Sequence, residues 1–208
     1  SMKFLISICI LVFSVSCGNK SINTVDTSTY PDYEKATLRD SNGNITAVVE
    51  IPAGTNHKFE YNYESKRFEC EIRGGKERMV HFLPYPGNYG FIPGTLMEKE
   101  RGGDGDALDV LVLAESIPQG KRIAIHPIAT LKLLDKGEED HKIIAVPVSN
   151  DLNVLKVTSF EDLSSSVKEI IKTWFVSYKG PGKMQFQSWE SDSATFAEIE
   201  KWERRGDL

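Results

Sequence analysis

The chain has 208 residues, of which 40% are hydrophobic and 26% are charged, and its formal net charge is −5. A chain of this length and composition forms one domain, or at most two small ones, with a sizeable hydrophobic core. No run of Lys and Arg resembles a nucleic-acid footprint, so we expect no nucleic-acid partner.

The first seventeen residues are predicted to be a targeting segment and no part of the fold. Ser1 is interpreted as a cloning scar, and the apolar run over residues 4–15 is too short to span a bilayer comfortably. The ending FSVSCGN resembles the lipobox of bacterial lipoproteins, with Cys17 as the lipidated residue, although Ser14 stands where Leu is commonest. An uncleaved membrane anchor is the alternative. Both interpretations predict an exported protein anchored in a bacterial envelope, on its periplasmic or cell-surface face.

Residues 18–40 are polar, rich in Ser, Thr and Asn, and without an apolar period. This composition predicts a flexible tether between the lipid and a domain over residues 41–208. Cys70 is the one cysteine outside the targeting segment. No intrachain disulfide is therefore expected, and the fold must depend on its core.

The first two thirds of the domain read as β-strands. β-branched and aromatic residues, partly alternating, predict strands over residues 45–52, 58–64, 66–73, 77–82, 107–115, 121–134 and 141–148. Residues 84–95 (PYPGNYGFIPGT) are predicted to form a loop, because Pro and Gly punctuate them. The acidic turn DKGEED, over residues 135–140, separates the last two strands.

The pattern then changes to a helical period. Apolar residues recur at three- and four-residue steps over residues 167–178, and Ser166 with Glu169 predicts a capping box. The sequence Gly180-Pro181-Gly182 is expected to stop this helix, and a shorter helix is predicted over about 193–204. Strands followed by terminal helices predict an α+β fold, a compact barrel-like sheet with helices packed outside.

Acidic residues gather where strands begin and end. Asp104, Asp106 and Asp109 lie within six positions of GGDGDALDVLVL, and Asp135 and Asp140 bracket the acidic turn. Five converging carboxylates would raise one another's pKa unless cations neutralised them. Mg²⁺ prefers a few carboxylate oxygens together with water and substrate phosphate. A solvated acidic loop is the plainer alternative.

Basic residues beside the carboxylates favour the metal site. Lys58 alternates with Glu60 on one predicted strand, and Lys142 lies two residues after Asp140. A site for a metal-bound polyanion needs both kinds of group: carboxylates for the metals and cations for the phosphate oxygens that the metals leave uncovered. The combination predicts phosphoryl transfer to water.

Five segments then carry a family resemblance: DGDALDVL, VVEIPAGTNHKFE, YPGNYGFIPGT, DKGEEDHK and SYKGPGK. In these segments the chain resembles the soluble, metal-dependent inorganic pyrophosphatases of family I, with the motifs in family order across about 48–190. The resemblance implies a five-stranded OB-like β-barrel with additional strands and flanking C-terminal helices. It also implies Mg²⁺-dependent hydrolysis of pyrophosphate, with several ions per active site and a dimeric or hexameric assembly.

The resemblance implies a role for each matching residue. Asp106 would take the proton of the attacking water, and the metal ligands would be Asp104, Asp109, Asp135, Asp140 and Glu50. Substrate phosphate would be bound by Lys58, Arg78, Tyr89, Lys142, Tyr178 and Lys179. Other pocket residues would be Glu60, Tyr85 and Lys183, the last placed in a flexible segment after the helix.

Two positions depart from the family pattern. Ala107 stands where the family has Pro or Glu, which predicts a looser metal site. Either Arg78 or Arg73 fits the phosphate-binding arginine by spacing, and Arg78 is preferred. None of the four histidines is expected to bind a metal.

Two other functions remain open from the sequence. The enzyme could prefer another phosphoanhydride, such as a nucleotide or a short polyphosphate. A non-catalytic OB-like surface binding module could also keep this scaffold, although the intact set of Asp and Lys residues argues against it.

Overall fold

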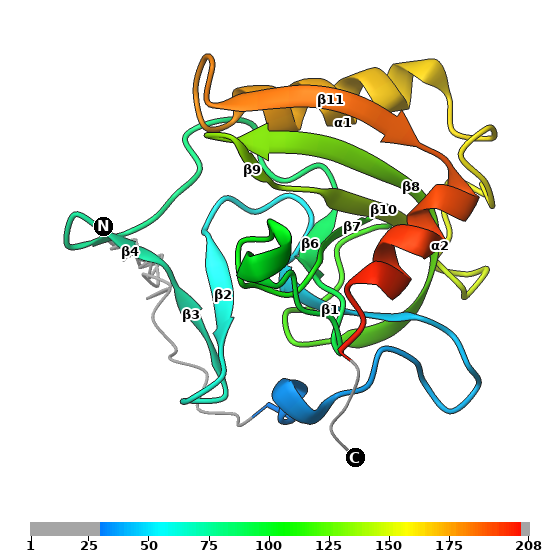
Figure 1. Cartoon of the computed structure of the whole chain (residues 1–208), viewed down its shortest axis with the longest axis horizontal. Helices are drawn as coiled ribbons and strands as arrows, with labels where there is room; N and C mark the ends of the chain where they lie inside the picture. Colours follow the sequence, from blue (N-terminus) through cyan, green and yellow to red (C-terminus); the bar gives the residue numbers. More distant parts are fainter. Residues whose placement is uncertain (1–29, 205–208) are drawn as a thin grey trace, which may run out of the picture.

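The computed structural model describes residues 30–204, drawn in colour in Figure 1. No helix in this part of the chain is long and apolar enough to cross a membrane. The predicted targeting segment, with Cys17, lies outside the described residues.

Five strands close into a ring. β1 (Thr46–Ile51) pairs antiparallel with both β6 (Asn88–Phe91) and β8 (Arg122–Asp135). β7 (Asp109–Val112) pairs antiparallel with β6 and parallel with β10 (Lys142–Pro147). Because β10 also pairs antiparallel with β8, the order β1-β6-β7-β10-β8 returns to β1. The structure therefore confirms a sheet closed on itself.

The remaining elements surround this ring (Figure 1). The later part of the 14-residue β8 also pairs with β9 (Glu138–Glu139) and β11 (Met184–Glu190). β2 (Phe59–Asn62) with β3 (Arg67–Cys70), and β4 (Ile72–Arg73) with β5 (Lys76–Glu77), form two small antiparallel pairs. The helices are α1 (Ser165–Ser177) and α2 (Asp192–Lys201), with 3₁₀ turns at Tyr33–Lys35 and Lys99–Arg101.

Alternate residues of the ring strands enter different cores. Val110 of β7 packs in one cluster with Trp202, which follows α2. Leu111 packs in another with Trp174 and Phe175 of α1. Because successive side chains of a strand point to opposite faces, both faces of β7 are buried. Asp109 shares the parity of Leu111, so this carboxylate lies on the face that α1 covers.

The Pro- and Gly-rich segment predicted as a loop contains β6, so that prediction was wrong over residues 88–91. A Cβ atom on Gly90 would lie 1.9 Å from the carbonyl oxygen of Val48 on the neighbouring strand. Gly90 is therefore required by the close approach of two strands. The predicted strand over residues 77–82 was also wrong: β5 ends at Glu77, and Met79 forms only an isolated bridge with His57.

The predicted start of α1 needs correction as well. Ser164 is the N-cap, and its hydroxyl accepts a hydrogen bond from the Val167 amide at 3.3 Å. The expected capping box from Ser166 does not form, because Ser166 lies inside the helix and is not its N-cap; Glu169 pairs with Lys172 at 2.6 Å. The helix ends before Gly180, as predicted.

The chain after α1 was only partly anticipated. The flexible segment assigned to the residues after the helix is limited to a turn, because β11 begins at Met184 and pairs with β8. The second helix is found at Asp192–Lys201, close to the predicted range.

Residues 30–40, which were predicted as the end of the tether, pack against the domain. The Tyr33 ring is 3% exposed, and its hydroxyl donates a hydrogen bond to the Gly120 carbonyl at 2.5 Å. The Tyr61 hydroxyl donates to the Pro31 carbonyl at 2.9 Å. Leu38 is also buried. Residues 30–40 are thus part of the folded domain and not of a flexible tether.

Candidate active site

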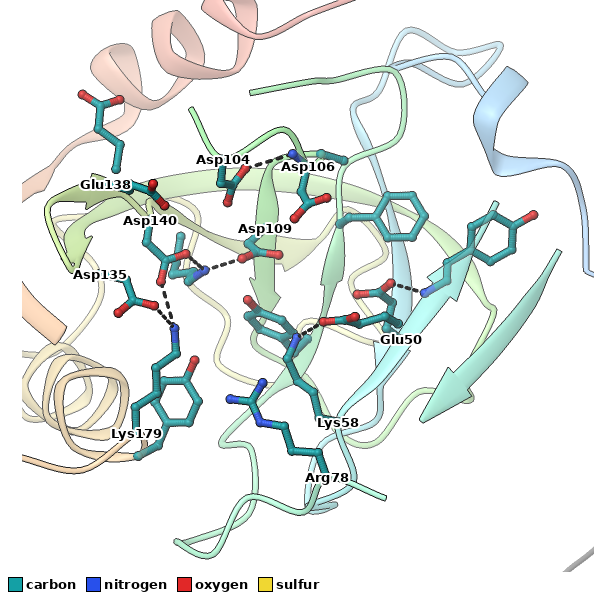
Figure 2. A pocket seen from close by; sticks show the side chains of 18 of the residues that line it. Glu50, Lys58, Arg78, Asp104, Asp106, Asp109, Asp135, Glu138, Asp140 and Lys179 are labelled. Carbon is teal, nitrogen blue, oxygen red and sulfur yellow. Dashed lines mark hydrogen bonds and ion pairs between the residues drawn. The ribbon is translucent and has the colours of Figure 1, made fainter. Parts of the chain in front are cut away.

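One cavity of about 380 Å³ gathers most of the predicted functional side chains. Figure 2 shows the Asp104, Asp106 and Asp109 carboxylates in one group, with Asp135 and Asp140 beside it. The cavity is lined by Glu50, Lys58, Glu60, Tyr61, Tyr63, Arg78, Tyr89, Phe91, Asp104, Asp106, Ala107, Asp109, Asp135, Glu138, Glu139, Asp140, Lys142, Tyr178 and Lys179. Nine carboxylates face four cations, a surplus of five formal negative charges.

Ends of the ring strands place these groups. Asp109 begins β7, Lys142 begins β10 and Asp135 ends β8, so the three side chains meet where these strands begin or end. Tyr178 is the C-cap of α1 and stacks on Trp174, with ring centroids 4.7 Å apart. A rigid sheet and one helix end therefore hold groups that are far apart in the sequence.

Asp104 and Asp106 belong to one tight turn. The Asp106 amide donates a hydrogen bond to Oδ1 of Asp104 at 2.9 Å, and Gly105 between them has φ +95°. Such a φ favours glycine, which lets the two side chains leave the turn close together. Burial, followed by the charges of Asp104 and Asp109, raises the pKa of Asp106. The raised pKa makes Asp106 a better proton acceptor than an exposed aspartate.

Lys142 is the buried cation between two carboxylates. Its ammonium donates to Asp109 and to Oδ1 of Asp140, the latter at 2.5 Å, and its side chain is 2% exposed. Burial disfavours the charged ammonium, but Asp109 and Asp140 outweigh this effect and raise the pKa of Lys142 well above its usual value. Lys142 therefore stays charged in the pocket.

Lys179 is a second cation that contacts the carboxylates of the pocket. Its ammonium donates to Oδ2 of Asp135 at 2.8 Å and lies 3.6 Å from Oδ2 of Asp140. Oδ1 of Asp135 and Oδ2 of Asp140 are buried without a hydrogen-bond partner. A buried carboxylate oxygen without a hydrogen bond is costly, so a cation close to either of these two atoms would be stabilised.

Glu50 is the buried carboxylate that β1 contributes to the pocket. The Tyr61 amide donates to its Oε1 at 2.7 Å, and Glu50 is 7% exposed. Burial raises the pKa of Glu50 to about 8, although the charge of Lys58 opposes the shift. Lys58 itself pairs with Glu60 at 2.9 Å. Without added cations, the pocket thus disfavours a fully ionised set of carboxylates.

Two predicted residues lie outside the lining of this cavity. Tyr85 is 2% exposed and packs beside Tyr89, with centroids 5.1 Å apart, so it supports the pocket from below its surface. Lys183 lines a neighbouring cavity instead. Arg78, which pairs with Glu71, lines both cavities, whereas Arg73 lines only the second.

Several lining residues were not predicted from the sequence. Tyr61, Tyr63 and Phe91 were read only as strand or loop residues. Glu138 is the register partner of Asp135 in the β8–β9 hairpin, a position that the acidic turn could have indicated. Burial raises the pKa of Tyr63 to about 12, so its hydroxyl remains protonated beside the carboxylates.

The donor set fits hard divalent cations. The groups in surplus are carboxylate oxygens, and such cations take oxygen ligands. Asp104, Asp109, Asp135, Asp140 and Glu50 would hold them. In the described residues Lys142 and Lys179 occupy the space between Asp109, Asp140 and Asp135, so entering cations would replace contacts that the lysines make.

A separate group lies between β9, β10 and α2. Over residues 30–204, three candidate ligand atoms within 4.8 Å of one another occur only at Glu139, His141 and Glu198. His141 Nδ1 lies 3.0 Å from Glu198 Oε1, which also accepts from the Trp202 indole at 2.8 Å. These contacts already satisfy Glu198, so the group joins α2 to the sheet.

Comparisons with known proteins place the chain in a family. The family model described as inorganic pyrophosphatase matches residues 47–206. The chain is 37% identical over 153 residues to an inorganic pyrophosphatase of Sulfolobus acidocaldarius, covering 71% of this chain and 82% of that protein. It is 34% identical over 171 residues to one of Neisseria meningitidis serogroup B, covering 78% and 91%.

A solved structure gives the same result. The crystal structure of an inorganic pyrophosphatase from Neisseria gonorrhoeae superimposes with a TM-score of 0.67 at 31% identity, covering 83% of this chain and 97% of that one. The fold and the charged pocket define an enzyme that acts on phosphoanhydrides. More specifically, the chain belongs to the inorganic pyrophosphatase family and is an inorganic diphosphatase.

Proposed function

We propose that the chain hydrolyses inorganic pyrophosphate to two phosphates with Mg²⁺ as its metal. The observation that carries the proposal is the surplus of carboxylates over cations in one cavity. A tetra-anionic substrate would be repelled from such a cavity unless divalent cations entered with it. A site for metal alone would not need basic residues. The lysines and the arginine that line the same cavity would bind the phosphate oxygens of the substrate.

Bound divalent metal would supply charge neutralisation and a water of lowered pKa. The chain's own residues would do the rest. Asp106, with its raised pKa, would accept the proton of the attacking water. Arg78, Lys179 and Tyr178 would bind the departing phosphate, and Lys58 and Lys142 would hold the phosphoryl group under attack. Since the pathway needs no covalent intermediate, no Cys or Ser nucleophile is required.

The five-stranded ring is best interpreted as an OB-like barrel. It has the number of strands expected for that fold, and the charged pocket lies where strands of the ring begin and end. Because the ring is closed, none of its five strands is an edge strand. The closed ring gives a rigid support for the charged groups.

The N-terminal segment supports a second part of the proposal: the enzyme is exported and tethered to a bacterial membrane through lipid on Cys17. The support is the lipobox-like ending of a short apolar run. A dimer or hexamer, as the family resemblance suggests, would have to place all its N-terminal arms toward one membrane.

Phosphate release from pyrophosphate and from ATP, measured side by side with Mg²⁺, tests the choice of substrate. We expect faster release from pyrophosphate. Rapid ATP hydrolysis with slow pyrophosphate hydrolysis would favour a nucleotide as substrate, and no hydrolysis of either would favour a binding module.

A further inference from the structure

A second cavity adjoins the active site. Its volume is about 530 Å³, and it shares Arg78, Asp135, Tyr178 and Lys179 with the first cavity. Four shared lining residues make the two spaces neighbours across one wall. Figure 2 shows Arg78 and Lys179 on the side of the active site away from Asp104 and Asp106. The second cavity therefore continues the site beyond the end that would hold the departing phosphate.

The two cavities have opposite charge. The second is lined by two carboxylates and by five cations: Arg73, Arg78, Lys136, Lys179 and Lys183. Glu71 pairs with Arg78, and Asp135 pairs with Lys179. Within residues 30–204, the other three cations make no ion pair. An anion entering this cavity would thus meet three unneutralised positive charges without any need for metal.

Pyrophosphate does not account for these charges. In the proposed function its two phosphoryl groups would be bound by metal on the carboxylates and by Lys58, Lys142, Arg78 and Lys179, all in the first cavity. Arg73, Lys136 and Lys183 line only the second. A ligand that reaches them from the active site must extend past Arg78 and Lys179, and it must be anionic there.

We propose that the second cavity is a subsite for a third phosphoryl group, so that the enzyme also binds and hydrolyses linear tripolyphosphate. This proposal rests on the proposed function. In the reaction, water would form a P–O bond to the terminal phosphorus near Asp106, which takes its proton. The bridging P–O bond would break, its electron pair would go to the bridging oxygen, and pyrophosphate would leave from the Arg78 side.

Lys136 offers a clean test of the subsite. It lies in the turn between β8 and β9 with φ +54°, it is exposed, and it does not line the first cavity. Asn tolerates this backbone conformation, so Lys136→Asn removes the charge with little strain. Lys156 is a matched control: it is exposed, has φ +55°, and lines neither cavity.

The experiment measures binding of pyrophosphate and tripolyphosphate by titration calorimetry with Mg²⁺ at low ionic strength. It uses the full-length chain carrying Asp106→Asn to slow turnover. We expect Lys136→Asn to weaken tripolyphosphate binding about three- to ten-fold, as for one charge-assisted contact, and to leave pyrophosphate binding within about two-fold. Arg73→Gln should act in the same direction. Lys156→Asn should change neither.

The possible results distinguish a failure of the proposed tripolyphosphate subsite from a failure of the proposed pyrophosphatase function. The subsite is refuted if Lys136→Asn weakens both anions equally, leaves tripolyphosphate unaffected, or matches Lys156→Asn. That result can coexist with pyrophosphate hydrolysis by the unmodified chain, in which case the proposed function stands. If pyrophosphate is neither bound nor hydrolysed while tripolyphosphate binding depends on Lys136, the function fails and the subsite stands.

Discussion

Lys142 and Asp109 are direct register partners on the parallel strands β10 and β7, and the lysine ammonium donates to the aspartate carboxylate. The same ammonium binds Asp140, which lies two residues earlier on the chain. Two carboxylates that we propose as metal ligands are therefore held together by a protein cation. The lysine side chain is only 2% exposed, so its charge depends on these two carboxylates and not on water.

Lys142→Met should make the fold depend on divalent metal. Without metal, Asp109 and Asp140 would lose their buried counter-charge, and we expect the free energy of unfolding to fall by about 3–5 kcal/mol. Added Mg²⁺ would replace that charge, so it should raise the melting temperature more in the variant than in the unmodified chain.

Lys132→Met is the matched control for this experiment. Lys132 lies on β8, its side chain is 33% exposed, and it approaches Glu190 only to 3.9 Å. Its loss should leave the response to Mg²⁺ unchanged. An equal Mg²⁺-induced rise in melting temperature for Lys142→Met and the unmodified chain would show that metal does not compete for these carboxylates.

Asp106→Asn and Asp109→Asn should respond differently to metal and to pH. The first removes the proton acceptor and should reduce turnover by roughly 10²–10⁴-fold, the scale of general-base catalysis. Raising the pH supplies hydroxide directly and should restore this variant better than Mg²⁺ does. The second removes a metal ligand, so it should weaken Mg²⁺ affinity, and extra Mg²⁺ should recover part of its rate.

Steady-state phosphate release over a grid of Mg²⁺ concentration and pH measures both variants. Identical responses of the two variants across the grid would mean that the roles assigned to Asp106 and Asp109 are wrong, even if the enzyme is a pyrophosphatase.

The free energy of unfolding should depend on pH through Glu198. Burial opposes its charge, but hydrogen bonds from His141 and Trp202 prevail and lower the pKa of Glu198 from 4.5 to about 2. A carboxylate whose pKa is lower in the folded state stabilises the fold above its unfolded pKa, and this contribution is lost as the pH falls from 4.5 toward 2.

Glu198→Gln should therefore lower the free energy of unfolding at pH 7 by about 1–3 kcal/mol. The difference from the unmodified chain should shrink as the pH falls below 4.5, as measured by urea unfolding from pH 7 to pH 3. Glu200→Gln, an exposed neighbour on α2, is the control. A difference that stays constant with pH would indicate a packing effect alone.

Much of the site could be predicted because its charged residues lie close together in short segments of the sequence. The Asp104–Asp106–Asp109 and Asp140–Lys142 spacings are local features, and the family resemblance implied the further residues. Thirteen of the fifteen domain residues predicted for the site line the cavity. The choice between Arg78 and Arg73 could not be made from spacing, because it depends on how β4 and β5 turn relative to the pocket.

The missed features depend on long-range contacts. The strand at Asn88–Phe91 is hidden by the Pro and Gly residues in and around it, and Gly90 is required there by the approach of Val48 on β1. The packing of Tyr33 depends on Tyr61 and Gly120, which are distant in the sequence. A polar composition around residues 30–40 gives no sign of these partners, so the segment was read as tether.

The localisation proposal has its own test, on a residue outside the described part of the chain. Cys17→Ser should release soluble protein or leave the signal uncleaved when the full chain is expressed in a bacterium. Incorporation of a labelled fatty-acid analogue should disappear in this variant, with Cys70→Ser as the control that keeps the label. Undiminished labelling of Cys17→Ser would refute the lipidation site.

Metal-dependent hydrolysis is measured directly as phosphate release from pyrophosphate by the full-length chain, first with a chelator and then with Mg²⁺ restored. The surplus of carboxylates in the pocket predicts negligible release without metal and two phosphates per pyrophosphate with Mg²⁺. Release that persists at the same rate in excess chelator, or no release at any Mg²⁺ concentration, would contradict it.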